Sequence, residues 1–199
     1  MRSLTLAITG ASGAQYGLRL LEVLLQSNCK VHLLVSDAAK QVINLETELR
    51  LPSDDAKLND YFSVLYKAQP SQLRVYGKTE WTSAVASGSN APDAMVICPS
   101  SSGTLSAIAC GASNNLIERA ADVMLKERKQ LIVVHRESPL STIHLRNLLT
   151  LSEMGVTVMP ASPGFYHKPQ SVDDMVDFVV ARILDHLGMP QNLMARWGE

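Results

Sequence analysis

Short apolar runs bounded by turn residues recur along the chain and alternate with stretches of helical periodicity. Five runs predict strands, at Leu4 to Thr9, Val31 to Val35, Ala94 to Cys98, Leu131 to His135 and Val156 to Met159. Strands that alternate with helices are typical of a parallel sheet, and strands that are nearly all apolar are typical of a sheet covered on both faces. The pattern predicts an α/β fold: a doubly wound, Rossmann-like parallel sheet with helices on both faces.

Two further stretches have their own patterns. Residues 171–187, SVDDMVDFVVARILDHL, carry apolar residues at helical spacing after a possible N-cap, Ser171, and predict a C-terminal helix. The stretch from Leu51 to Ser89 has weaker periodicity and ends in a region of small residues. We predict an irregular insertion there, lying over the edge of the sheet.

Composition limits the classes of protein that fit. The 199 residues are 46% apolar, enough for one substantial core, so we expect a single domain over residues 1–199. A formal net charge of −1 gives no electrostatic reason to expect nucleic acid or an anionic membrane as a partner. No window reaches the roughly 18 apolar residues of a membrane-spanning helix. We therefore expect a soluble, cytoplasmic protein.

Cysteine and histidine spacing gives no sign of a metal site. The three cysteines form no C-x-x-C pair, so neither a disulfide framework nor a zinc site is indicated, and a reducing compartment is expected. None of the five histidines forms an H-x-x-x-H pair or lies beside cysteines at zinc spacing. We predict no tightly held metal ion.

The first candidate binding loop is LAITGASGAQYG, residues 6–17. A strand, a glycine-rich turn and a helix start point free backbone N–H groups at an anion or a ring carbonyl, which favours a nucleotide-like ligand. Asp37 follows the second predicted strand, where a dinucleotide-binding protein has its ribose-binding acid. The glycines, however, form G-x-x-G-x-x-x-G rather than G-x-G-x-x-G, and no Tyr-x-x-x-Lys is present. These departures argue against nicotinamide binding.

Ser12 lies within this loop and has three possible roles. A serine-hydrolase elbow requires G-x-S-x-G, and Ala14 occupies the place of the last glycine. Ser12 is then a ligand-binding or proton-relay residue, or simply the N-cap of the helix that follows. The relay and capping roles are compatible with each other.

A second loop rich in hydroxyl groups follows the third predicted strand. It reads CPSSSGTLSAIACGASNN, residues 98–115, and lies where doubly wound folds bind ligands. We expect the two loops to share one ligand. The alternative is a pair of ordinary turns in which the hydroxyl groups only cap helices.

Charged residues could bind a phosphate group. Arg119 and Lys126 are seven residues apart, so a helix would project both from nearly the same side. The alternative is a solvated face on which Glu118, Asp122 and Glu127 neutralise them. Charged and polar residues also follow the last two predicted strands, where functional side chains are often placed: Arg136, Glu137, Tyr166, His167 and Lys168.

Five blocks in order resemble the bacterial flavin prenyltransferases of the UbiX type. They read AITGASGAQYGLRLLEVL, MVICPSSSGTLSAIACGASNNLIERAADVMLKER, HRESPLSTIHLRNLLTLSEMGV, PASPGFYHKPQSVDDMVDFVVARILDHLG and RWGE. The resemblance implies an enzyme that transfers the dimethylallyl group of dimethylallyl monophosphate to N5 and C6 of reduced FMN. The product, prenylated FMN, would serve a UbiD-type decarboxylase in ubiquinone biosynthesis. The resemblance also implies metal independence and a homo-oligomer, a dodecamer with sites at subunit interfaces.

The resemblance assigns roles to individual residues. The flavin contacts that it implies are Gly10, Ala11, Ser12, Ser36, Ser101, Ser102, Gly103, Thr104 and Arg136. The prenyl phosphate contacts are Ser87, Arg119, Lys126, Tyr166 and Arg182, with Trp81 as an aromatic wall. The catalytic residues are Ser12, Glu46, Lys126 and Glu137. Which acidic residue would remove the C6 proton stays open, and a phosphate oxygen is a third candidate.

One position departs from the family pattern, and two other functions compete. His135 stands where the family usually has proline, which puts the local backbone geometry in question. A flavin-dependent cysteine decarboxylase would share the fold, but it typically has a histidine base in the first helix region, where Gln15 and Tyr16 stand here. A non-catalytic FMN-binding protein would need no phosphate-binding cluster beyond that for the flavin itself.

Overall fold

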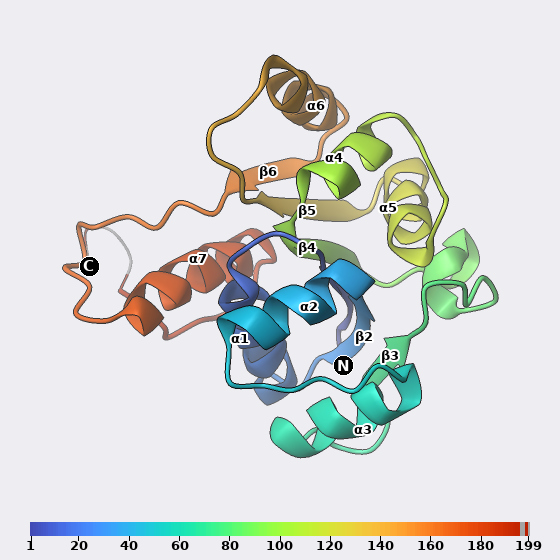
Figure 1. Ribbon diagram of the computed structural model, residues 1–199, viewed down its shortest axis with the longest axis horizontal. Helices are drawn as coiled ribbons and strands as arrows, with labels where there is room; N and C mark the ends of the chain where they lie inside the picture. The colour runs from blue at the N-terminus through green and yellow to red at the C-terminus, as the bar shows by residue number, and fades with distance from the viewer. Residues whose placement is uncertain (196–197, 199) are drawn as a thin grey trace.

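The computed structural model describes residues 1–195 and 198 and contains a six-stranded sheet in the order β3-β2-β1-β4-β5-β6 (Figure 1). All neighbouring strands are parallel. The strands are β1 Ser3–Ile8, β2 Lys30–Val35, β3 Leu73–Tyr76, β4 Ala94–Ser100, β5 Gln130–His135 and β6 Thr157–Pro160. The five predicted strands and the doubly wound parallel sheet are confirmed.

Seven helices connect and cover the strands. They are α1 Ala14–Gln26, α2 Asp37–Glu46, α3 Asp55–Leu65, α4 Ser102–Ala109, α5 Leu116–Lys126, α6 Thr142–Glu153 and α7 Val172–His186. Two 3-10 turns, η1 Ala84–Ala86 and η2 Gly88–Asn90, precede β4. The predicted C-terminal helix is α7, and the Ser171 hydroxyl caps it by accepting a hydrogen bond from the Asp174 N–H.

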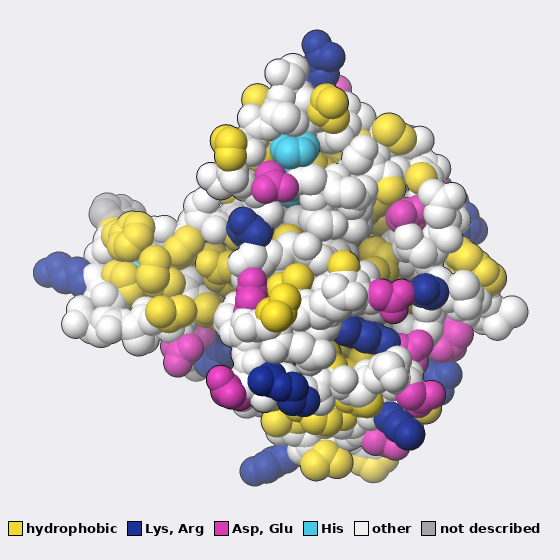
Figure 2. All heavy atoms as spheres, viewed as in Figure 1, with side chains coloured by type: hydrophobic (Ala, Val, Ile, Leu, Met, Phe, Trp, Pro, Cys, Tyr) yellow, Lys and Arg dark blue, Asp and Glu magenta, His cyan; other side chains and the backbone are white. Residues whose placement is uncertain are grey.

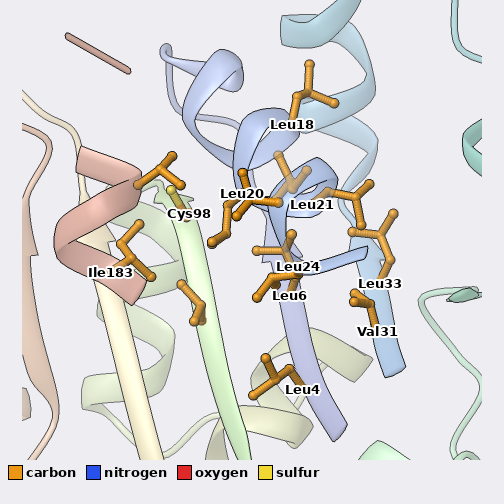
Figure 3. Packing of buried hydrophobic residues seen from close by; sticks show 14 of the residues in the cluster. Leu4, Leu6, Leu18, Leu20, Leu21, Leu24, Val31, Leu33, Cys98 and Ile183 are labelled. Carbon is orange, nitrogen blue, oxygen red and sulfur yellow. The ribbon is translucent and has the colours of Figure 1, made fainter. Parts of the chain in front are cut away.

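The central strands are mostly apolar because they are covered on both faces. In β1, Leu4, Leu6 and Ile8 pack with α1, α2, α3 and α7, whereas Ala7 points to the opposite layer. Figure 3 shows the first of these layers, with Leu20, Leu21 and Leu24 of α1 close to Leu6 and Leu33 of the sheet. The second layer contains η1, α4, α5 and α6. Two apolar layers around one sheet confirm that helices cover both faces.

The interpretation of residues 51–89 as an irregular insertion is wrong. The segment contains α3, the edge strand β3 and the η1 turn. In β3 only Leu73 and Val75 are buried, and α3 buries only Leu58 and Phe62, so neither element has a strong apolar pattern of its own. Pairing with β2 and packing on the sheet, rather than local periodicity, determine both elements.

Candidate flavin and phosphate site

Three helices begin at the carboxyl ends of the central strands. α1 follows β1, α2 follows β2 and α4 follows β4, and the direction of strand progression reverses between β1 and β4. A reversal of this kind opens a crevice at which doubly wound folds bind ligands, and helix N-termini favour anions there. The predicted flavin contacts lie on these three turns and on β5's end.

The two predicted loops lie side by side. The Ser101 N–H donates to the Thr9 hydroxyl at 2.8 Å, and the Thr9 N–H donates to the Pro99 carbonyl at 3.2 Å. These bonds tie the turn after β1 to the turn after β4. The arrangement fits the expectation that one ligand contacts both loops.

Ser36 and Ser101 cap helices. The Ser36 hydroxyl accepts from the Ala39 N–H at 3.0 Å, and the Ser101 hydroxyl accepts from the Thr104 N–H at 3.3 Å. Both serines therefore cap helices, as the alternative interpretation expected, although it allowed them no other role. The Ser36 hydroxyl still has a proton to donate to a ligand oxygen, whereas the Ser101 hydroxyl donates to the Thr104 hydroxyl at 3.1 Å.

Gly10 and Gly13 allow the tight first turn. A side chain at position 10 would put its Cβ 2.5 Å from the Ala38 Cβ, so only glycine lets the first turn of α2 pass so close. Gly13 has φ +96°, in the left-handed region, and is itself the N-cap residue of α1. Ser12 is therefore not the N-cap, contrary to one of its three possible roles.

The Glu46 carboxylate takes over the capping of α1. Its Oε2 accepts from the N–H groups of Gly13 at 2.8 Å and Ala14 at 3.1 Å. Partial burial acts to raise the pKa of Glu46. Hydrogen bonds from the Ser12 hydroxyl and from these two N–H groups, together with the charge of Arg136, have the opposite and larger effect. The pKa of Glu46 therefore lies below its usual value. The Ser12 hydroxyl is thus connected to an acidic side chain.

Arg136 and Glu137 lie at the end of β5, as predicted. The Arg136 Nε donates to the Ser12 carbonyl at 3.1 Å, which connects β5 to the first loop. The Glu137 Oε2 accepts from the Ser102 hydroxyl at 2.8 Å, and its Oε1 accepts from the Ser138 N–H at 3.2 Å. These bonds lower the pKa of Glu137, so this exposed carboxylate is ionised near neutral pH.

His135, at the position of the family's proline, ends β5 beside Ser100 of β4. Its ring is buried, and its Nδ1 lies 3.2 Å from the Ser100 carbonyl. Burial lowers the pKa of His135. The N–H of Arg136 still donates to the Ser100 carbonyl, so the backbone continues the β4–β5 pairing beyond the substituted position.

Arg119 and Lys126 of α5 both lie against the loop that carries Ser87. The Arg119 Nε donates to the Ala86 carbonyl at 3.1 Å, and a Cβ added at Gly88 would lie 2.9 Å from the Lys126 Nζ. The predicted same-side projection is confirmed. The alternative was that acidic residues neutralise these cations on a solvent-exposed face. It holds in part, because Asp122 pairs with Arg119 and Glu127 pairs with Lys126. Glu118 instead accepts bonds from the N–H groups of Asn114 and Asn115.

The remaining predicted substrate residues lie elsewhere in the chain. Tyr166 and Arg182 line a separate cavity of about 690 Å³ between the loop before α7 and the chain after it. Trp81 lies in the loop after β3 and is 46% exposed. A single chain thus brings Ser87, Arg119 and Lys126 together but does not add Tyr166 and Arg182 to them.

Sequence reasoning missed a small cavity beside the flavin residues. It has a volume of about 180 Å³ and is lined by Ser36, Asp37, Lys78 and Thr104, among others. The Lys78 Nζ lies 2.8 Å from an Asp37 carboxylate oxygen. No local signal marks Lys78, because it belongs to the stretch interpreted as an insertion.

Three further features of residues 1–195 and Gly198 concern metal binding, membranes and cysteines. No group of three or more His, Cys, Asp or Glu side chains in that part of the chain is arranged to bind a metal ion. None of its helices is long and apolar enough to cross a membrane. Cys29, Cys98 and Cys110 are free thiols. The RWGE ending lies outside the described residues except for Gly198.

The fold and the site define an α/β flavoprotein. The model of the family described as Flavoprotein matches residues 1–184. The flavin prenyltransferase UbiX of Pseudomonas aeruginosa is 58% identical over 98% of this chain and 94% of that protein. The chain belongs to the UbiX flavin prenyltransferase family within the flavoproteins.

Solved structures agree with this placement. A structure of AnUbiX (PadA1) in complex with FMN and dimethylallyl pyrophosphate has a TM-score of 0.88 and 37% identity, covering 100% of this chain and 98% of that one. A dodecameric FMN-dependent UbiX-like decarboxylase from Escherichia coli O157:H7 has a TM-score of 0.86 and 40% identity, covering 99% and 100%. A PPC decarboxylase mutant, at 22% identity and TM-score 0.59 over 81% and 83%, shares the fold alone.

Proposed function

We propose that this protein is a flavin prenyltransferase that joins a dimethylallyl group to N5 and C6 of reduced FMN. The observation that carries the proposal is the pair Arg119 and Lys126 beside Ser87, a cationic site additional to the flavin crevice. A carrier of FMN alone has no use for this second site. The family membership supports the same function.

The residues of the crevice fit a phosphorylated, hydroxyl-rich flavin. Gly10 lets the start of α2 lie close to the first turn, and the hydroxyl groups of Ser36, Ser101 and Thr104 lie at two helix N-termini that favour an anion. Gly10, Ala11, Ser12, Ser102, Gly103 and Arg136 complete the proposed flavin contacts. When bound, reduced FMN supplies the nucleophilic N5 and C6 positions.

The proposed prenyl phosphate residues stabilise a leaving group. The carbon–oxygen bond of the donor breaks and phosphate departs, so Arg119, Lys126 and Arg182 balance its charge, and Ser87 and Tyr166 donate hydrogen bonds. The allylic carbon bears positive charge, which the ring of Trp81 tolerates. A bond to N5 forms as the N5 proton leaves. The prenyl double bond is then protonated, C6 bonds to the resulting tertiary carbon and the C6 proton leaves to a base, so the flavin gains one C5H8 unit overall.

The two acidic residues divide the remaining tasks. The Glu46 carboxylate accepts hydrogen bonds from the first N–H groups of α1 and from Ser12. We therefore assign Glu46 the role of positioning the turn after β1, which carries the proposed flavin contacts. Glu137 is exposed at the end of β5, and its carboxylate accepts from the Ser102 hydroxyl and the Ser138 N–H. We assign Glu137 as the base at C6, and Ser12 as the link between flavin and Glu46.

A homo-oligomer, a dodecamer as in the UbiX-like relative, would bring Tyr166 and Arg182 to a neighbouring chain's site. Exposed apolar residues support a chain-to-chain interface, because Phe165 and Val172 are 68% and 71% exposed around the loop before α7. Figure 2 shows hydrophobic side chains gathered over this projecting part. We expect light scattering to give a mass several times 21.7 kDa, and a fully active monomer would contradict the shared site.

The product, prenylated FMN, would pass to a UbiD-type decarboxylase of ubiquinone biosynthesis. We expect no nucleic acid or membrane as a partner, and a single cytoplasmic domain. The cysteine decarboxylase and the non-catalytic FMN-binding protein stay as the alternatives to be separated by experiment.

One anaerobic assay separates the three functions. The purified protein is mixed with reduced FMN and dimethylallyl monophosphate, with the pyrophosphate as a second donor, and the flavin products are weighed by mass spectrometry. A prenyltransferase yields a product one C5H8 unit heavier than FMN. A carrier yields unchanged FMN, and a cysteine decarboxylase acts only when a cysteine-ended substrate is supplied. Flavin released by heating should be FMN, and a nicotinamide dinucleotide there would overturn the assignment.

The Lys126→Ala variant tests the phosphate site. Loss of one charge-assisted phosphate contact should cost about 1.5 to 3 kcal/mol, or roughly ten- to a hundredfold in prenylation efficiency, with FMN affinity near normal. Steady-state rates against donor concentration and FMN fluorescence titration measure the two quantities. Lys57→Ala, on the exposed side of α3, is the matched control. Wild-type prenylation in Lys126→Ala would remove that residue from the site.

A further inference from the structure

The cavity of about 180 Å³ beside the flavin crevice has a distinctive charge arrangement. It extends from the start of α2 to the starts of α4 and α5, and its lining includes Ser36 and Thr104, two proposed flavin contacts. Of the described residues that line it, Lys78 is the only cation and Asp37 the only acid. The cavity therefore combines an apolar part, formed by residues such as Leu34, Leu116 and Ile117, with hydroxyl groups and one ion pair.

Lys78 is held at this cavity by its backbone as well as by its side chain. Its carbonyl accepts from the Leu116 N–H at 2.9 Å, which fixes the loop after β3 to the first residue of α5. Its Nζ lies 2.8 Å from the Asp37 carboxylate in the first turn of α2. The ion pair is exposed, with 70% and 67% of the two side chains accessible, so water or an anion can compete for the ammonium group.

A phosphate group fits this arrangement only if the charge of Asp37 is balanced. The Ser36 and Thr104 hydroxyls and the helix N-termini behind them attract an anion, but they are neutral groups. A phosphate monoester brings nearly two negative charges close to a carboxylate, which repels it. The Lys78 ammonium group, 2.8 Å from the Asp37 carboxylate, carries one positive charge that offsets part of this repulsion.

We propose that Lys78 recognises the phosphate of the flavin mononucleotide. Without the flavin its ammonium group pairs with Asp37, and with FMN bound it contacts both Asp37 and the phosphate. Lys78 is thereby the residue that makes the site select FMN over riboflavin, while Asp37 sets the strength of that selection. This inference rests on one part of the proposed function, the binding of FMN, and does not depend on prenyl transfer.

The test compares FMN with riboflavin, which lacks only the phosphate. Dissociation constants of both flavins are measured for the flavin-free full-length protein by fluorescence quenching, at low and high ionic strength. Lys78→Gln should weaken FMN about tenfold and leave riboflavin unchanged. Asp37→Asn should tighten FMN severalfold, because it removes the repelling charge and frees Lys78. Lys30→Gln, at the opposite end of β2, is the control and should change neither constant.

The measured quantity is the ratio of the two dissociation constants, so a general loss of folding does not imitate the result. A wild-type protein without preference for FMN, or a Lys78→Gln ratio within twofold of wild type, would overturn the proposal. Failure of the proposed function gives a different pattern. In that case the wild type forms no prenylated product while the FMN preference and its loss in Lys78→Gln are still observed.

Discussion

Glu137→Gln is expected to lower the formation of prenylated FMN about a hundredfold while both FMN and the prenyl donor still bind. The substitution keeps the size of the side chain and its bond to the Ser102 hydroxyl but removes the group that accepts the C6 proton. General base catalysis contributes roughly a hundredfold or more, which sets the size of the effect. Single-turnover rates, with flavin fluorescence titration for binding, measure both quantities.

The pH dependence gives a second readout of the same variant. Bonds from Ser102 and Ser138 lower the pKa of Glu137 below the ordinary 4.5, so the carboxylate is ionised at neutral pH and loses its charge only as the pH falls below that value. The wild-type rate should therefore fall as the pH drops below the pKa of Glu137. In Glu137→Gln the rate should no longer depend on pH in that range. Glu153→Gln, at the exposed end of α6, should keep both the rate and its pH dependence.

Glu46→Gln should behave differently from Glu137→Gln. The Glu46 carboxylate caps α1 and contacts Ser12. Replacing it with an amide should weaken these bonds, destabilise the turn after β1 and lower the affinity for flavin. If Glu137→Gln instead loses FMN affinity and Glu46→Gln loses only turnover, the two assignments are reversed. If neither variant slows turnover, the C6 proton leaves to another group, such as the phosphate oxygen of the donor.

The second large effect concerns stability. Gly17→Ala is expected to lower the free energy of unfolding by about 2 to 3 kcal/mol, because an added methyl would lie 2.3 Å from the Cys98 carbonyl oxygen. That atom belongs to the backbone of β4 and cannot move aside as a flexible side chain could. Helix α1 would have to lift away from the sheet. Thermal and urea unfolding, followed by circular dichroism, measure the change.

Gly103→Ala is the matched control for stability. Gly103 also lies inside a helix, α4, but an added Cβ meets nothing within 4 Å. Alanine is the better helix former, so this variant should unfold at equal or higher stability, by up to about 1 kcal/mol. Equal stabilities of Gly17→Ala and wild type would contradict the close contact between α1 and β4.

The sequence by itself determined the parallel sheet, the helices on both faces and the turn after β1. Strands such as β1 and β4 consist mostly of apolar residues because they are covered on both faces, and that requirement is visible in composition alone. Helix α7 was equally readable, from its spacing and from the Ser171 cap. These features depend on neighbours in the chain, so local patterns predict them.

The tertiary structure alone decided the features that depend on distant residues. β3 exists because it pairs with β2, Glu46 caps a helix that begins 32 residues before it, and Lys78 meets Asp37 across 41 residues. Arg119 and Lys126 could be placed on one helix side from sequence, but only packing brings them to the loop of Ser87. Hydrogen bonds and ion pairs between remote segments leave no periodic signal in the sequence, because only the folded chain brings their partners together.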